Sequence, residues 1–254
     1  MDGLLKGRRA LVTAGAQGIG LAISRALLSE GCDLAVHYLS SEETAAALQT
    51  EAAAQGKRVG VFCADLTDSE QTAGLVRRAV EFLGGLDILI NNAGALIARR
   101  RLDDVDSAFW RQVMDVNISS MMNVTRCALS ALRAAGGASV VNMASLAGRK
   151  GGHPGSLAYS TAKGAVLTFT RALAAELGPD GIRVNAVAPG LILETNFHNT
   201  HTTKESAAAT IAQIPLGRAG TPADVARAVV FLAGQFDGFI TGATLDINGG
   251  VYCA

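Results

Sequence analysis

A tyrosine, a lysine and a serine occur in this chain at a spacing that suits proton transfer. Tyr159 and Lys163 are four residues apart within a run, Ser156 to Leu177, in which Ala, Leu and Val recur at intervals of three and four. Such a run predicts a helix, on which residues i and i+4 share one face. We therefore expect the phenol and the ammonium to approach each other. Ser145 supplies a hydroxyl fourteen residues before the tyrosine.

The chemistry of this trio depends on the pKa of the phenol. A free phenol titrates near ~10, so its pKa must fall by roughly 2, worth roughly 3 kcal/mol, before it acts well at neutral pH. An ammonium about 4 Å away contributes on the order of 4 kcal/mol at an effective dielectric of ~20, so one lysine suffices. The same spacing also arises by chance in helices, and its meaning depends on the rest of the sequence.

The composition indicates a globular chain without a charge bias. The 254 residues are 49% hydrophobic and 17% charged, with 22 basic and 22 acidic residues. This balance gives no indication of nucleic-acid or membrane-surface partners, and no apolar run of about 18 residues predicts a membrane span. The N-terminus lacks a secretory apolar region, and the four cysteines lack C-x-x-C spacing. We expect a cytoplasmic protein with buried, reduced thiols.

Short β-rich runs alternate with longer Ala/Leu-rich runs along the chain. This alternation predicts one α/β domain, residues 1–254, with a seven-stranded parallel sheet flanked by helices on both faces in three layers. The expected strands are Arg9–Thr13, Asp33–Tyr38, Arg58–Ala64, Ile88–Asn91, Ser139–Met143, Arg183–Val187 and Ala243–Ile247. The expected helices are Gly18–Glu30, Glu42–Gln55, Ser69–Phe82, Ser107–Ala135, Ser156–Leu177 and Thr221–Ala233.

One polar segment, Glu194 to Pro215, has no place in the alternation. Connections of this length in compact domains are often functional, so we expect a substrate lid at about 194–215, with a disordered surface loop as the alternative. His198 and His201 lie within it, but no third ligand is near in the sequence, and no metal site is expected.

The first strand-to-helix turn has the composition of a phosphate-binding turn. It reads Thr13-Ala14-Gly15-Ala16-Gln17-Gly18-Ile19-Gly20. Glycines let the backbone approach a pyrophosphate, and the helix N-terminus offers unpaired N–H groups and the positive end of its dipole. No Gly-Lys-Ser/Thr follows, so this is not a Walker loop. The turn therefore predicts a dinucleotide site, although a tight turn with close helix packing has the same composition.

Together with this turn, further motifs resemble the compact branch of the short-chain dehydrogenase/reductase family over essentially the whole chain. They are Asn91-Asn92-Ala93-Gly94, Asn117, Ser145, Tyr159/Lys163, Pro189-Gly190, Ile240-Thr241-Gly242 and Asp246-Ile247-Asn248-Gly249-Gly250. The resemblance implies a Rossmann fold, a nicotinamide cofactor, and a homotetramer or dimer packed through the helices that carry Asn117 and Tyr159. It includes members that act on 3-oxoacyl thioesters, on glucose and on polyols.

The resemblance also implies a role for each matching residue. Tyr159 would exchange a proton with the substrate oxygen, Ser145 would hydrogen-bond that oxygen, and Lys163 would lower the pKa of the tyrosine and hold the nicotinamide ribose. Asn117 would hold a water that connects Lys163 to solvent, unless its side chain simply faces solvent. The cofactor would contact Gly15, Gln17, Gly18, Ile19, Gly20, Tyr38, Asp65, Leu66, Asn92, Ala93, Gly94, Tyr159, Lys163, Pro189, Gly190 and Ile192. As an alternative to adenine contact, Asp65 would cap the helix that begins at Ser69.

Two positions depart from the family pattern. Ala14 stands where the first glycine is usual, and a positive φ there would cost alanine about 1 kcal/mol, so we expect either a relaxed turn or strain carried by Gly15. The run Leu191 to Thr195 is one residue longer than the common pattern, and we therefore assign no cofactor contact to Thr195.

Cofactor choice depends on the end of the second strand, Val36 to Ser41. An acidic residue there would bind the ribose diol and repel a 2′-phosphate, and none is present. Tyr38 takes that position, and Ser40 and Ser41 can accept a phosphate. NADP(H) is favoured, with NAD(H) as the alternative because Gln17 and Leu39 provide no cation.

The sequence thus predicts an NAD(P)-dependent oxidoreductase that interconverts a ketone and a secondary alcohol. The candidate substrates are a 3-oxoacyl thioester, a small keto compound, and a sugar or polyol. We expect the substrate pocket to be walled by Leu96 to Arg101, Leu146 to Ser156 and Glu194 to Pro215. The basic side chains there, Arg149, Lys150, His153, His198 and His201, favour a sugar, polyol or acidic substrate, or else are rim residues in water. The alternative function is a non-catalytic dinucleotide-binding sensor or scaffold, which would not need the proton relay of Tyr159 and Lys163.

Overall fold

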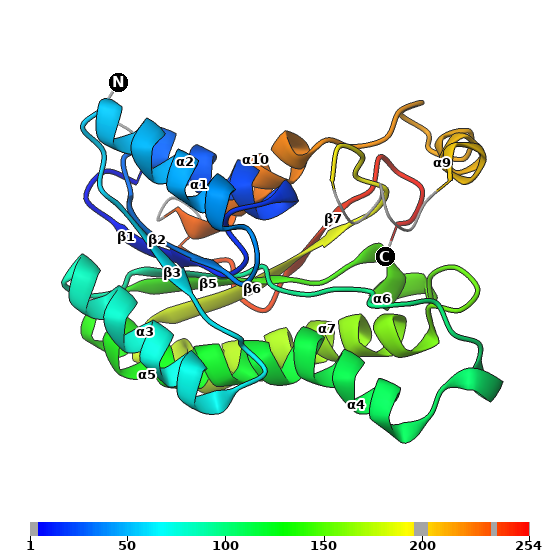
Figure 1. Ribbon diagram of the computed structural model, residues 1–254, viewed down its shortest axis with the longest axis horizontal. Coiled ribbons are helices and arrows are strands. Elements are labelled where there is room, and N and C mark those ends of the chain that lie inside the picture. Colours follow the sequence, from blue (N-terminus) through cyan, green and yellow to red (C-terminus); the bar gives the residue numbers. More distant parts are fainter. Residues whose placement is uncertain (1–4, 196–202, 235–237, 254) are drawn as a thin grey trace.

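The computed structural model describes residues 5–195, 203–234 and 238–253. Within these ranges seven strands form one parallel sheet in the order β3-β2-β1-β4-β5-β6-β7 (Figure 1). The order reverses between β1 and β4, which is where open parallel sheets bind ligands, at the carboxyl ends of the strands. The strands are β1 (Arg9–Val12), β2 (Asp33–Tyr38), β3 (Val59–Cys63), β4 (Ile88–Asn91), β5 (Ala138–Met143), β6 (Ile182–Pro189) and β7 (Thr244–Ile247).

Helices cover both faces of the sheet, so the predicted three-layer Rossmann fold is confirmed (Figure 1). One layer consists of α1 (Gly18–Ser29), α2 (Glu42–Ala54) and α10 (Pro222–Ala233). The other consists of α3 (Ser69–Leu83), α5 (Ser120–Ala134) and α7 (Leu157–Leu177), with α4 (Ser107–Met114) beyond it.

Alternate residues of the central strands pack against opposite helix layers. In β1, Ala10 and Val12 belong to the core under α1, α2 and α10, whereas Leu11 belongs to the core with α3 and α5. The same alternation divides Ile88 and Ile90 from Leu89 in β4. Because both faces are buried, the residues from Ala10 to Val12 and from Ile88 to Ile90 are all apolar.

The predicted helix Ser107–Ala135 is wrong in one respect, because a π-helical turn, Asp115–Ser119, divides it into α4 and α5. Asn117 lies in this turn, and its Nδ2 donates to the carbonyl of Val113 at 3.0 Å. That carbonyl, four residues back, is the acceptor that the backbone N–H of residue 117 would use in an α-helix. The side chain therefore competes with the helical ladder at this point.

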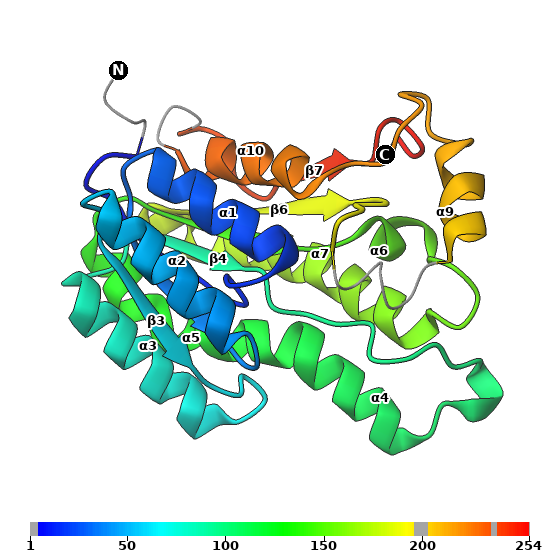
Figure 2. The ribbon, with the colours of Figure 1, turned by 45° about the horizontal axis from the view of Figure 1, so that its top comes forward.

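Two short α-helices within the described ranges were not predicted. They are α6 (Leu146–Lys150) and α9 (Lys204–Ile211), which Figure 2 shows beyond the carboxyl ends of β6 and β7. Thr203 caps α9, since its Oγ1 accepts from the N–H of Ser206 at 3.2 Å. The disordered-loop alternative is thus wrong for this part of the segment, while His198 and His201 lie outside the described residues.

The described ranges contain no helix with the length and apolar character that a membrane crossing requires, and no group of three potential metal ligands. The expectation of buried thiols is right for Cys32 but wrong for Cys63 and Cys253, which are exposed at the end of β3 and near the C-terminus.

Candidate active site

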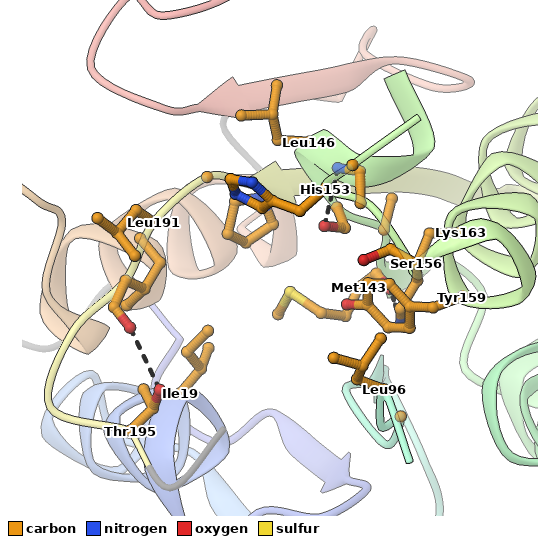
Figure 3. Close-up of a pocket in the computed structure, with 18 of the residues that line it drawn as sticks. Ile19, Leu96, Met143, Leu146, His153, Ser156, Tyr159, Lys163, Leu191 and Thr195 are labelled. Carbon is orange, nitrogen blue, oxygen red and sulfur yellow. Dashed lines mark hydrogen bonds between the residues drawn. The ribbon is translucent and has the colours of Figure 1, made fainter. Parts of the chain in front are cut away.

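A cavity of about 480 Å³ opens at the carboxyl ends of the strands. The segments that follow β1, β4, β5 and β6 line it, together with residues of α6, α7 and α9 (Figure 3). Its position is the one that the reversal of strand order predicts for a ligand site.

Tyr159, Lys163 and Ser145 meet at this cavity. Lys163 is 2% exposed, and its Nζ donates to the carbonyl of Met143, the last residue of β5, at 2.8 Å (Figure 3). The same Nζ lies 5.8 Å from the centre of the Tyr159 ring, as the helical spacing predicted. Ser145 forms a hydrogen bond with the Tyr159 hydroxyl, and its Oγ also accepts from the N–H of Ala147 at 3.1 Å. The sequence thus placed these three groups together correctly.

Burial shifts the pKa values of both Tyr159 and Lys163. It raises the pKa of Tyr159 to about 12, although the hydrogen bond from Ser145 acts in the opposite direction. It lowers the pKa of Lys163 to about 8, because an ammonium enclosed by protein loses its hydration. The expected fall in the pKa of Tyr159 is therefore wrong for this structure, in which the Lys163 ammonium donates to Met143.

Asn117 is fully buried, so the alternative that it faces solvent is wrong. Its Nδ2 donates to the carbonyl of Ala95 at 2.7 Å, and its Oδ1 accepts from the Ala95 N–H at 3.1 Å. This reciprocal pair ties the π-helical turn to the segment that follows β4.

Gly94 lies between Asn117 and Lys163. A Cβ atom at Gly94 would be 2.8 Å from Asn117 Oδ1 and 2.8 Å from Lys163 Nζ. Both polar atoms therefore flank the backbone of Gly94, and a side chain there would separate them. The glycine is needed for space, because its φ is not positive.

The glycine-rich turn is held by side chains from β2 and from the segment after β4, and by a side chain of its own. Ala14 has a φ of 47°, and Gly15 is not in the positive-φ region, so Ala14 itself carries the strain. Its N–H donates to Nδ1 of His37 at 3.0 Å, and its carbonyl accepts from Nδ2 of Asn92 at 3.1 Å. Thr13 Oγ1 accepts from the N–H groups of Asn92 and Ala93. These bonds offset the roughly 1 kcal/mol that alanine loses in this conformation.

His37 is committed at both ring nitrogens. Nδ1 accepts from Ala14, and Nε2 lies 3.0 Å from the carbonyl of Ala64, to which it must donate. This arrangement assigns the neutral tautomer with the proton on Nε2. Burial lowers the pKa of this 2%-exposed ring, opposed by the Ala64 carbonyl and by Asp65.

The comparisons with known proteins agree with this geometry. A family model described as "Enoyl-(Acyl carrier protein) reductase" matches residues 13–252. An acetoacetyl-CoA reductase of Rhizobium meliloti is 38% identical over 247 residues, which cover 97% of this chain and 99% of that protein. The chain belongs to the short-chain dehydrogenase/reductase family.

Solved structures similar to this short-chain dehydrogenase/reductase include proteins described with different nicotinamide cofactors. A blue fluorescent protein from a metagenomic library, in complex with NADPH, has a TM-score of 0.91 and 34% identity, covering 98% of this chain and 99% of that one. An NADH-dependent reductase described as responsible for alginate metabolism has a TM-score of 0.89 and 34% identity, with the same coverage.

Most residues that the resemblance assigned to the site of this short-chain dehydrogenase/reductase line the cavity. They are Gln17, Gly18, Ile19, Gly20, Asn92, Gly94, Ser145, Tyr159, Lys163, Pro189, Gly190 and Ile192. Thr195, for which no contact was assigned, also lines it and is 5% exposed. Leu96 and Leu146, which were expected as pocket walls, line it, and so does Met143, which only its sequence position near Ser145 could have indicated.

Other assigned residues lie away from the cavity lining, namely Gly15, Tyr38, Asp65, Leu66, Ala93 and Asn117. Gly15 is a packing glycine, since a Cβ there would be 2.9 Å from Ser24 Oγ. Leu66 is part of the core. The alternative that Asp65 caps α3 is wrong, because Asp68 accepts the N–H groups of that helix, whereas Asp65 accepts from the N–H of Thr67 at 2.9 Å.

The residues around the turn fit a dinucleotide. A Cβ at Gly20 would collide with the carbonyl of Ala14 and lie 2.5 Å from Asn92 Nδ2, so only glycine permits this close turn at the start of α1. α1 has no side-chain cap, which leaves its first N–H groups available to an anion. In this short-chain dehydrogenase/reductase, Gln17, Gly18 and Ile19 would hold the pyrophosphate.

The Gly94 geometry predicts the outcome of Gly94→Ala. The added methyl group displaces Lys163 Nζ or the Asn117 carboxamide, so we expect dinucleotide-dependent turnover to fall about tenfold or more, with a loss of about 1–3 kcal/mol in unfolding free energy. Steady-state kinetics and chemical denaturation measure the two effects. Gly74→Ala in α3 is the matched control, since nothing lies within 4 Å of its Cβ position. It should lower neither the turnover nor the free energy of unfolding. Wild-type turnover by Gly94→Ala would contradict this placement.

The His37 geometry predicts a pH effect on the turn. A histidine in the unfolded chain titrates near ~6.5, and the pKa of His37 in the folded protein is lower. The neutral ring therefore stabilises the fold fully above the pKa of the unfolded chain. This stabilisation is lost as the pH falls through the pKa of the folded protein. Between pH ~7.5 and ~5.5 the free energy of unfolding of the wild type should therefore fall more than that of His37→Gln. Dinucleotide affinity should fall over the same range. Parallel pH profiles for wild type and His37→Gln would reject this role.

Proposed function

We propose that this protein is an NAD(P)H-dependent reductase that interconverts a ketone and a secondary alcohol, with Tyr159 as the general acid/base. The observation that carries this proposal is the Tyr159 hydroxyl, which is hydrogen-bonded with Ser145 and adjacent to the buried Lys163 ammonium. All three face a cavity whose other end is the glycine-rich turn. Similarity to an acetoacetyl-CoA reductase supports the same reaction class.

In the direction of reduction, Ser145 would donate a hydrogen bond to the carbonyl oxygen, and Tyr159 would transfer its proton to that oxygen. A bound nicotinamide would supply or accept the hydride at the substrate carbon. With a pKa of about 12, the phenol is protonated at neutral pH, and transfer of its proton would depend on a charge that stabilises the phenolate left behind.

Lys163 and Asn117 would act on the proton rather than on the substrate carbon. The Lys163 ammonium would stabilise the phenolate left after transfer, and its pKa of about 8 would allow it to return a proton near neutral pH. Asn117, beside it across Gly94, would hold the water that connects Lys163 to solvent. A non-catalytic sensor would leave this desolvated ammonium beside a phenol unexplained.

We propose NADP(H) as the preferred cofactor. The end of β2 has no carboxylate to repel a 2′-phosphate, and Ser41 Oγ donates to Gln17 Oε1 at 3.1 Å, which brings the β2 end and the glycine-rich turn together. Ser40, Ser41 and the Gln17 amide would receive the phosphate. The NADPH complex of a similar structure supports this choice, and the NADH-dependent neighbour supports NAD(H) as the alternative.

The substrate candidates are a 3-oxoacyl thioester, a small keto compound, and a sugar or polyol. The acetoacetyl-CoA reductase supports the first and the alginate-related reductase the third. The expected walls line the cavity, through Leu96 and Arg99, through the 146–156 segment, and through Ser206 and Thr210 of α9. Because α9 has no buried residue of its own, we propose that it serves as the described part of the substrate lid.

We also propose a cytoplasmic homotetramer or dimer built from a single domain spanning 1–254. Two exposed features support association. β7 is an edge strand that no other described strand covers on its outer side, and Met122 on α5 is 41% exposed.

Tyr159→Phe tests the proposed function. We expect kcat for ketone reduction to fall at least about 10³-fold, with dinucleotide affinity changed less than about threefold, because only the proton donor is removed. A screen of ketones, sugars and polyols with NADPH and NADH, read by cofactor absorbance, provides the rate. Tyr252→Phe near the C-terminus is a matched control. Activity of Tyr159→Phe within tenfold of wild type would refute the role.

Tyr38→Asp tests cofactor choice. A carboxylate at the end of β2 would accept hydrogen bonds from the ribose diol and repel a 2′-phosphate, so the ratio of kcat/KM for NADPH over NADH should fall by about tenfold or more. Paired kinetics with both cofactors measure this ratio. A strong preference of the wild type for NADH would show that the proposed choice is incorrect.

A further inference from the structure

The substrate end of the cavity is lined by positive charge. Arg99, Lys150 and His153 all line it, and the charges of Arg99 and Lys150 both help to lower the pKa of His153, which places the three groups near one another. Among the described residues, no Asp or Glu lines the cavity.

Two arginines that are adjacent in sequence to Arg99 and Lys150 are paired with carboxylates. Arg100 pairs with Asp106 at 3.5 Å, and Arg149 binds both oxygens of Asp246 at 3.1 Å. The sequence had grouped Arg149 with the substrate residues, and this ion pair assigns it to the contact with β7 instead. Within the described residues, neither Arg99 nor Lys150 has a carboxylate within ion-pair distance.

Arg99 is instead held by a neutral partner. Its Nη1 donates to Ser156 Oγ at 2.6 Å, and Ser156 is 4% exposed. A guanidinium that is anchored through one nitrogen keeps its remaining donors for a planar acid group, and less side-chain entropy is lost when such a group binds. Recognition of an anion requires a positive charge that is held in a fixed position and is not already paired with a carboxylate.

The position of Ser156 sets the distance to the reacting group. Ser156 precedes Tyr159 by three residues at the start of α7, so their Cβ atoms are about 5–6 Å apart. An acid group bound at Arg99 and a carbonyl oxygen bound at Tyr159 would share one cavity of about 480 Å³, which limits the length of the substrate between them.

We propose that Arg99, assisted by Lys150, binds the carboxylate of the substrate, and that the protein selects small ketones that carry a carboxylate a few bonds from the carbonyl. This inference rests on the proposed function, since it names the substrate class of the same site. It makes Arg99 the residue that distinguishes a keto acid from a neutral ketone of the same shape.

The test compares 4-oxopentanoate with its methyl ester, which differ in one charge. Binding to the protein with NADP⁺ is measured by calorimetry, and kcat/KM is measured with NADPH. We expect the wild type to bind the acid at least about tenfold more tightly than the ester, and Arg99→Gln to lose that difference. Arg99→Lys should retain part of it, because the charge remains but the planar fork is lost.

Arg101→Gln is the matched control, since it removes an equal charge from an exposed residue two positions away that does not line the cavity. It should retain the preference for the acid. Equal binding of acid and ester by the wild type, or an equal loss in Arg99→Gln and Arg101→Gln, would overturn the inference. Selective binding of the acid without turnover would support carboxylate recognition by Arg99 and contradict the proposed reaction. Turnover of neutral ketones alone would support the proposed reaction and contradict carboxylate recognition.

Discussion

The hydrogen bond from Lys163 Nζ to the carbonyl of Met143 fixes the relation between α7 and the sheet. An ammonium removed from water is costly unless it is hydrogen-bonded, so this bond determines where the lysine can be and therefore which turn of α7 faces β5. The phenol of Tyr159, one turn earlier, is directed into the cavity as a result. The same requirement explains Gly148, where a Cβ would be 2.6 Å from the backbone carbon of Lys163, because α6 must pass directly over this turn.

The glycine-rich turn depends on a second set of contacts, contributed by strands on both sides of β1. His37 arrives from β2, while Asn92 follows β4, and both bind the Ala14 peptide. The pyrophosphate end of the cavity is thus shaped by side chains that need not touch a ligand. Because these strands also contribute residues to the hydrophobic core, the conformation of the turn is coupled to the packing of the whole sheet.

Much of this architecture was predictable because it depends on local spacing. The apolar runs predicted the strands to within about two residues at each end, and the i, i+4 pair predicted the approach of Tyr159 and Lys163. The π-helical turn was not predictable, since it arises when Asn117 bonds Ala95, a partner distant in sequence. The pKa of Tyr159 depends on burial. Among the described residues, Arg149 forms an ion pair and Arg99 does not, because only Arg149 lies within reach of Asp246 of β7. None of these contacts can be inferred from residues that are close in sequence.

The π-helical turn has a consequence for the register of everything that follows it. Each residue of an α-helix rotates the chain by about 100°, so one additional residue in the turn shifts the face that α5 presents relative to α4. Phe109 and Val113 before the turn pack with α7, whereas Val124, Ala128 and Leu132 after it pack against the sheet and α3. A single deletion within Asp115–Ser119 would restore a continuous helix and rotate those three side chains away from their partners. In this chain, the length of the segment is therefore as strict a requirement as the identity of Asn117.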